Sequence, residues 1–215
     1  MAGGTADKLS SAERRMRREL AKSFDAAWKP RAKAAGWGYI RPTSFKQIGE
    51  WFVYVDPQIS TERNRSEITA TFKPFYIDDL ISRIMGFNGL DEAPLSLRAR
   101  GPHCLVIPMY TSSIERDGNL GEMIEAAEIF LTSLRTRVEA LTLDDFIAFT
   151  APAAGQVSAN QVAALIMAGR DEEADALCKL AIAIKTWGGP ARVASDGRMV
   201  SFFELAARWI ECKKV

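Results

Sequence analysis

The chain has 215 residues and a formal net charge of +1, with 47% hydrophobic and 26% charged residues. This composition is typical of globular proteins, and the length suits one large domain or two small ones. Its single histidine and three cysteines, none in a Cys-x-x-Cys pair, argue against a zinc site and against a disulfide framework.

The sequence also indicates the cellular compartment of the protein. No run approaches the roughly 18 apolar residues needed to cross a bilayer, and the first residues lack the apolar segment of a secretory signal. Unpaired cysteines suit a reducing compartment. We therefore expect a cytoplasmic protein with buried thiols and no membrane partner, and residues 1–9 as a disordered lead.

The first predicted element is a basic helix. Ser10 and Glu13 form a capping-box pattern, Pro30 should kink or end the helix, and Gly36 is a natural stop. The apolar positions at helical spacing are Met16, Leu20, Phe24, Ala27 and Trp28. Residues 1–41 hold ten Lys or Arg against four Asp or Glu, hence +6, whereas the remainder holds 18 against 23, hence −5.

Strand patterns follow the helix. Residues 45–56 are rich in aromatic and β-branched side chains, and residues 66–73 alternate apolar with polar ones, which is typical of a half-buried strand. A short strand at 39–41 can precede them. These patterns predict a small antiparallel sheet.

The middle of the chain mixes patterns. Residues 76–85 predict a short helix, and residues 103–110 form an apolar run that fits another strand. Between them, residues 86–102 contain several Gly and Pro and little periodicity. Such a segment is typical of a long functional loop.

From about residue 119 the pattern is helical. The first apolar stripe has alternating spacings of four and three, at Leu120, Ile124, Ala127, Leu131, Leu134, Val138 and Leu141. Such a stripe fits a core helix or a dimer seam. Capping patterns at Thr142, Ser158 and Ser201 begin three further helices, and residues 171–185 predict another.

These elements predict an α+β fold, in which an N-terminal helix with a small antiparallel sheet precedes a mostly helical C-terminal half. The predicted domains are an α+β domain at 10–115 and a helical subdomain at 116–215.

Few residues suggest catalysis. His103 and Cys104 are neighbours on a predicted strand, so their side chains would point to opposite faces. Asp56, Glu67 and Lys73 lack the close acid–lysine spacing of a nuclease, because Glu67 and Lys73 are six residues apart. We therefore assign no catalytic residue.

Two aspartate pairs are candidate metal ligands. Asp78 and Asp79, like Asp144 and Asp145, fall at predicted helix N-termini. The helix dipole and free N–H groups favour carboxylates there without any metal. We expect no metal and no cofactor.

The candidate partner-binding residues are acidic and aromatic. Glu122, Glu125 and Glu128 recur at spacings of three, so they share a strip of helix surface. That strip is either a solvated face or a docking site for a basic partner. Trp51 and Tyr54 are rival anchors, because these residue types dominate interface hot spots, although they fit the core equally well.

A family resemblance adds to this interpretation. The motif reads Phe-Asp-Ala-Ala-Trp-Lys-Pro at 24–30, Gly-Trp-Gly-Tyr at 36–39 and Ser-Phe at 44–45. With the strands at 51–55 and 68–72 and the helix start at 75–80, residues 10–110 resemble a bacterial domain family of unknown function. Its members are similar to, and sometimes occur among, immunity proteins of bacterial toxin systems. The resemblance implies antiparallel strands after a helix and a role in neutralising a toxin.

The leading hypothesis is a non-enzymatic cytoplasmic binding protein, an immunity protein that occludes the active surface of a basic toxin domain. One alternative is an enzyme whose site lies in the 86–103 loop; its candidate residues are Asp91, Glu92, Arg98, Arg100 and His103. Another is nucleic-acid binding by the basic helix; its candidate residues are Arg14, Arg15, Arg17, Arg18 and Lys22. The oligomeric state stays open.

Overall fold

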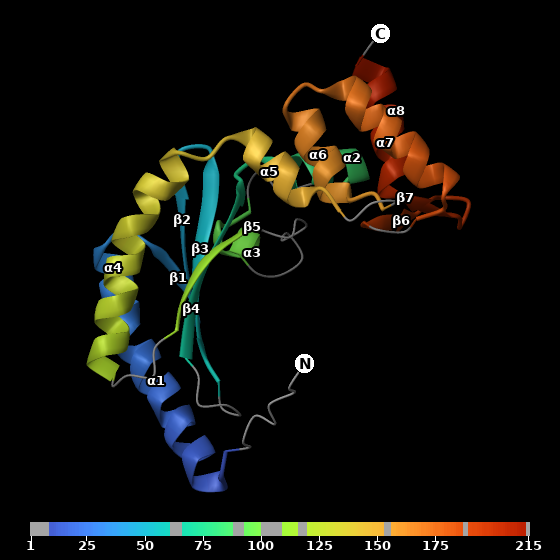
Figure 1. Ribbon diagram of the computed structural model, residues 1–215. Helices are drawn as coiled ribbons and strands as arrows, with labels where there is room; N and C mark the ends of the chain where they lie inside the picture. The colour runs from blue at the N-terminus through green and yellow to red at the C-terminus, as the bar shows by residue number, and fades with distance from the viewer. Residues whose placement is uncertain are drawn as a thin grey trace, which may run out of the picture. The chain divides into compact units, whose positions relative to one another are not determined.

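A computed structural model describes residues 9–60, 66–87, 93–99, 109–115, 120–152, 156–186 and 189–213, with the backbone alone for 109–115. The fold is α+β, as predicted: an N-terminal helix, an antiparallel sheet and a mostly helical C-terminal half (Figure 1). None of the helices in these ranges combines the length and the hydropathy that crossing a bilayer requires.

The chain divides into two compact units. Unit 1 comprises Met1–Phe72 and Tyr110–Glu139, and unit 2 comprises Lys73–Met109 and Ala140–Val215. This division differs from the predicted boundary after residue 115. The reason is that the helix at 120–139 packs with the N-terminal elements, whereas the helix that follows the fourth strand packs with the C-terminal helices.

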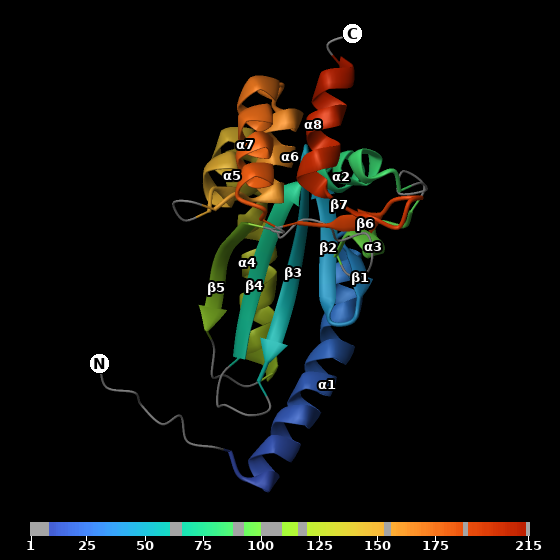
Figure 2. The same ribbon diagram turned by 90° about the vertical axis from the view of Figure 1, so that its right-hand side faces the viewer.

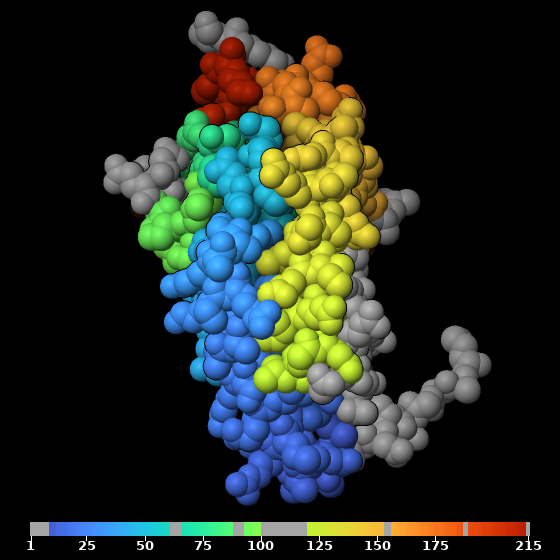
Figure 3. Space-filling view, turned by 90° about the vertical axis from the view of Figure 1, so that its left-hand side faces the viewer, coloured from blue at the N-terminus to red at the C-terminus, as the bar shows by residue number. Residues whose placement is uncertain are grey.

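Unit 1 is a sheet with two helices on one face. Its elements are α1 (Ser11–Ala34), β1 (Gly38–Ile40), β2 (Thr43–Ile48), β3 (Trp51–Ile59), β4 (Ser66–Pro74), β5 (Met109–Glu115) and α4 (Leu120–Glu139). The five strands lie in the order β1-β2-β3-β4-β5, each antiparallel to the next (Figure 2). Helices α1 and α4 pack against each other and run side by side over the sheet (Figures 1 and 3).

Helix α1 ends just before Gly36, the predicted stop, and Pro30 does not end it. The capping box at Ser10 and Glu13 forms, but the helix continues through Pro30 to Ala34. Trp28 and the residues around it explain this continuation, because burial of one helix face outweighs the local cost of a proline. The chain then turns at Gly36, where φ is +76°.

The predicted strand at 45–56 is two strands. Ile48 pairs with Trp51, so Gly49 and Glu50 form a two-residue hairpin turn. Gly49 has a φ of +55°, the left-handed region that such turns require. The run of β-forming residues on both sides of this glycine concealed the turn.

The apolar stripe of α4 belongs to the core. Its buried members are Ile124, Ala127, Leu131, Leu134 and Val138. Because this stripe faces the rest of unit 1, the core-helix interpretation holds and the stripe is not a dimer seam.

Unit 2 packs helices around a central one. Its elements are α2 (Ile77–Met85), α3 (Ser96–Ala99), α5 (Leu143–Thr150), α6 (Ala159–Met167), α7 (Asp171–Ala183), β6 (Ala191–Val193), β7 (Met199–Ser201) and α8 (Phe202–Lys213). Helix α6 contacts α2, α5, α7 and α8. Most of its residues are buried, as expected for a helix that is apolar on all sides.

Two of the three C-terminal capping patterns form. Thr142 caps α5 and Ser201 caps α8, each with a reciprocal hydrogen bond from the acidic residue three positions on. Ser158 is the N-cap residue of α6, so that helix begins where predicted, but its side chain makes no capping hydrogen bond and the capping box does not form. Cys178 is buried, and burial with nearby Asp175 raises the pKa of its thiol to about 12. Cys212 is exposed, contrary to expectation, and Cys104 lies outside the described residues.

The cap of α8 predicts a pH-dependent stability. The Glu204 carboxylate accepts hydrogen bonds from the Ser201 backbone N–H (2.8 Å) and hydroxyl (3.0 Å), which hold its pKa below the usual 4.5. We expect Glu204→Ala to lower the free energy of unfolding at pH 7 by about 0.3–1 kcal/mol. Because the pKa of Glu204 is lower in the folded state than in the unfolded state, its carboxylate stabilises the fold when the pH is above the unfolded pKa. The difference in stability between wild type and variant should therefore shrink as the pH falls below 4.5, and it should vanish below the lowered pKa. Urea unfolding at several pH values measures this, with Glu211→Ala, at the exposed end of the same helix, as the control.

Candidate functional site

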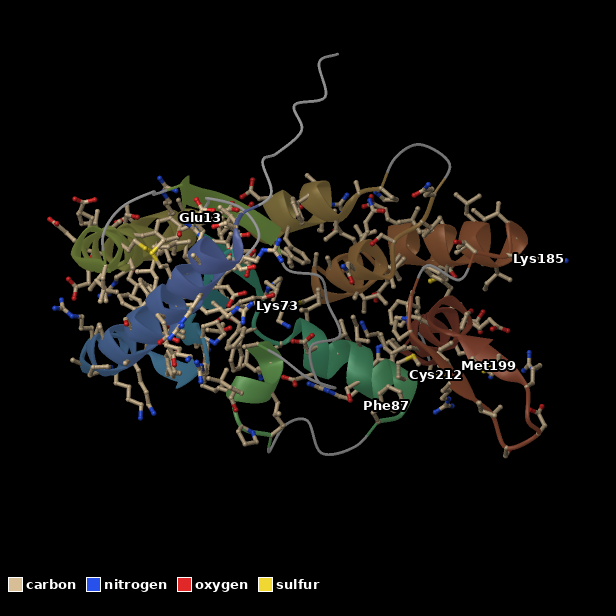
Figure 4. The ribbon with its side chains drawn as sticks, turned by 90° about the horizontal axis from the view of Figure 1, so that it is seen from below. Glu13, Lys73, Phe87, Lys185, Met199 and Cys212 are labelled. Atoms are coloured by element: carbon tan, nitrogen blue, oxygen red, sulfur yellow. The ribbon has the colours of Figure 1, made fainter. Side chains whose placement is uncertain are left out.

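Four charged side chains form a buried cluster in unit 2. Lys73, the next-to-last residue of β4, is where unit 2 begins. Asp78 and Asp79 lie in the first turn of α2, and Arg98 lies on α3; each of the four side chains is almost fully buried. The Lys73 ammonium (labelled in Figure 4) is 2.6 Å from a carboxylate oxygen of Asp78 and donates to the Arg98 carbonyl at 2.9 Å.

Arg98 completes this cluster. One terminal nitrogen of its guanidinium donates to both carboxylate oxygens of Asp79, at 2.8 and 3.0 Å, and the other donates to the Phe75 carbonyl at 3.0 Å. The guanidinium also lies over the Phe75 ring, 4.6 Å from its centre. Each buried carboxylate thus faces a buried cation, an arrangement that joins β4, α2 and α3.

The cluster gives a structural role to three residues considered from the sequence as metal ligands or catalytic groups. Asp78 and Asp79 are neutralised by Lys73 and Arg98, so their charges are matched without a metal ion. Lys73 was expected on the solvated face of β4, yet it is 0% exposed. Its partner Asp78 comes from the next helix, which strand alternation does not reveal.

The structure does not bring together the nuclease-like residues considered from the sequence, and it describes only one residue of the proposed loop site. Glu67 and Lys73 lie at opposite ends of β4, about 20 Å apart at the rise of a strand. Asp56 accepts a hydrogen bond from the Thr43 hydroxyl at 2.8 Å. Among the candidate residues of the loop site, Arg98 is described, and its side chain is bound within the buried cluster. The other members, Asp91, Glu92, Arg100 and His103, lie outside the described residues, as does Cys104.

The predicted acidic strip lies on the outer face of α4. Glu122 and Glu125 are exposed, and Glu128 forms an ion pair with Arg31 of α1 at 2.8 Å. Directly after Glu128 comes Ile129, an apolar side chain that is 62% exposed. Ile129 falls on the same side of the helix as Glu122, seven residues earlier. The strip therefore combines negative charge with one apolar side chain, which the charge pattern alone did not indicate.

The two aromatic candidates differ. Trp51 is 7% exposed and packs edge-to-face on Phe72, with ring centres 6.0 Å apart, so it belongs to the core and not to an interface. Its side of the sheet faces the helices, because Ser44, paired with Val55 on that side, accepts a hydrogen bond from Trp28 of α1. Tyr54, on the opposite side, is only partly buried.

A cavity of about 450 Å³ lies at the C-terminal end of the α4 strip. Its walls come from the end of α1, the β2–β3 turn and α4, and include Trp37, Ile48 and Leu131. Of the cations at its edge, Arg135 forms an ion pair with Glu139 at 2.9 Å, and the Lys46 ammonium lies 3.5 Å from the Ala35 carbonyl. The cavity is therefore a recess with both apolar and polar walls, next to the acidic strip.

The predicted basic cluster on α1 does not act as one group. Arg17 donates to the Ser60 carbonyl and, at 3.0 Å, to the Ser66 hydroxyl, which are at adjoining ends of β3 and β4. Arg14 donates to the Leu9 carbonyl at 3.0 Å. Arg15, Arg18 and Lys22, in contrast, are exposed.

Comparison of the chain with protein-family models, with curated proteins and with solved structures finds no match.

Proposed function

We propose that the protein is a non-enzymatic binding protein that uses the outer face of α4 to bind a basic protein surface. The observation that carries this proposal is the exposed Ile129 beside the exposed carboxylates of Glu122 and Glu125. Interfaces are held by apolar side chains that lose water, while charges around them select the partner.

The face is preformed. The opposite side of α4 is buried in unit 1, so binding does not require the helix to order, and that lowers the entropic cost of association. The recess lined by Trp37 and Leu131 together with polar side chains lies further along the same helix and is large enough for a side chain of the partner.

A negative surface of this kind fits a partner that binds polyanions. A toxin domain that cleaves nucleic acid has a basic groove for its substrate, and covering that groove would block the reaction without any chemistry. We therefore propose that the partner is a basic toxin domain of the host bacterium.

Charge reversal on α4 tests the proposal. We expect Glu122→Lys with Glu125→Lys to weaken partner binding by about tenfold or more for each charge reversed, mainly through slower association. The partner is captured from the native host with the wild-type chain and identified by mass spectrometry. Its affinity for each purified variant and its inhibition of cell growth are then measured.

The matched control is Glu172→Lys with Glu211→Lys, which makes the same change in charge at exposed positions of unit 2. It should bind and protect as the wild type does. The proposal fails if the captured partner is not toxic, or if the α4 variant binds it as tightly as the control does.

A further inference from the structure

Five cations of α1 lie along one side of the helix. They are Arg15, Arg18, Lys22, Lys29 and Lys33, and all five side chains are exposed. At 3.6 residues per turn they fall within a sector of about 60°, and at 1.5 Å per residue they extend over about 27 Å. We call this row the α1 stripe. It differs from the basic cluster predicted from sequence, because Arg14 bonds to the Leu9 carbonyl and Arg17 to residues at the ends of two strands, and neither lies in this sector.

The charge of the α1 stripe is largely uncompensated. Lys22 pairs with Glu19 at 2.9 Å, whereas none of the other four cations has an ion pair with a carboxylate of the described residues. Asp25 is the acidic side chain nearest to the stripe around the helix. It is already bound to the Tyr39 hydroxyl and, at 3.0 Å, to Arg41.

The α1 stripe is also separate from the acidic strip of α4. Arg31, which pairs with Glu128, lies about 160° around α1 from Arg15. The side of α1 that faces α4 is therefore nearly opposite to the stripe. Unit 1 thus has two surfaces of opposite charge, one on each of two helices. Figure 3 shows these helices, α1 and α4, side by side.

We infer that the α1 stripe binds the phosphate backbone of a nucleic-acid duplex without sequence preference. A straight row of cations about 27 Å long spans about eight base pairs of a duplex, whose phosphates carry the opposite charge. The stripe contains no large apolar side chain: Ser11 shares its sector, Ala26 lies about 20° outside it, and Met16 lies about 100° away. A protein interface would need such anchors, so charge without apolar area favours a polyanion. This activity goes beyond the proposed function, because it uses another helix and another class of ligand.

Salt dependence tests the inference. The probe is a fluorescently labelled DNA duplex of two helical turns and mixed sequence, titrated with the full chain at several salt concentrations. Release of counterions by four or five cations predicts a slope of log K against log salt of about −3.6 to −4.5. We expect Arg15→Gln with Arg18→Gln and Lys29→Gln to make this slope shallower by about 2.7. Glutamine keeps the helix propensity of these exposed positions.

The control is Arg83→Gln with Lys185→Gln and Arg208→Gln, which removes the same charge from exposed positions of unit 2. It should retain the wild-type slope, and so should the α4 variant Glu122→Lys with Glu125→Lys, which separates this test from that of the proposed function. The inference is overturned if the wild type does not bind the duplex at low salt, or if the control loses as much affinity as the stripe variant. It is also overturned if poly-glutamate binds as tightly as DNA, because that outcome indicates an acidic protein partner.

Discussion

Replacement of Arg98 by methionine is expected to lower the free energy of unfolding by about 3–5 kcal/mol. The change removes the two hydrogen bonds to Asp79 and the one to the Phe75 carbonyl, while leaving the Asp79 carboxylate buried. A buried charge without its partner costs far more than the pair contributes when it is complete. Guanidinium chloride unfolding, followed by circular dichroism, measures the loss.

The double variant Arg98→Met with Asp79→Leu separates this cause from simple loss of packing. Removing both charges should restore much of the lost stability, because no uncompensated carboxylate remains. If the double variant is as unstable as the sum of the two single ones, the cluster does not act as a charge pair. A loss below about 1 kcal/mol for Arg98→Met, the value typical of a surface pair, would show that water reaches the cluster.

Replacement of Trp28 by alanine should cost about 3–5 kcal/mol in unit 1. Trp28 is 1% exposed, stacks on Phe24 with ring centres 5.9 Å apart, and donates from its indole nitrogen to the buried Ser44 hydroxyl at 2.9 Å. The substitution leaves a cavity between α1 and the sheet and also leaves that hydroxyl without its donor. Urea unfolding followed by far-ultraviolet circular dichroism measures the change.

Two further variants separate the contribution of the hydrogen bond from that of the buried volume and provide a control. Trp28→Phe keeps most of the volume and loses the hydrogen bond, so it should cost about 1–3 kcal/mol. Met16→Ala changes an exposed apolar residue of the same helix and should stay within about 0.5 kcal/mol of the wild type. If Trp28→Ala were as mild as Met16→Ala, α1 would not be anchored to the sheet through this residue.

Local patterns predicted most of the elements, because their causes lie within a few residues. Alternation in β4 correctly indicated that Ile68, Ala70 and Phe72 are buried, and capping patterns marked the starts of α1, α5 and α8. The turn at Gly49 was missed because β-forming residues continue on both sides of it. The short strands β6 and β7 were missed for another reason, since three residues carry too little alternation to be recognised.

The candidate surfaces depend on contacts that no local pattern contains. Side chains alternate between the two faces of a strand, so Trp51 and Tyr54 of β3 must face opposite sides of the sheet. Only the position of the helices reveals that Trp51 is the buried one. On α1, the sequence shows a run of arginines without indicating that Arg17 is bound to the ends of two strands. The burial of Lys73 likewise follows from Asp78 on the next element.

The order of the segments along the chain has a consequence for synthesis on the ribosome. Unit 1 is made of two stretches separated by the first part of unit 2, and α4 lies in the second of them. During translation the strands β1 to β4 emerge long before α4, which together with α1 covers one face of the sheet. The nascent sheet therefore has an incomplete apolar face until residue 139 has left the exit tunnel, and a fragment ending at residue 115 would keep that face open.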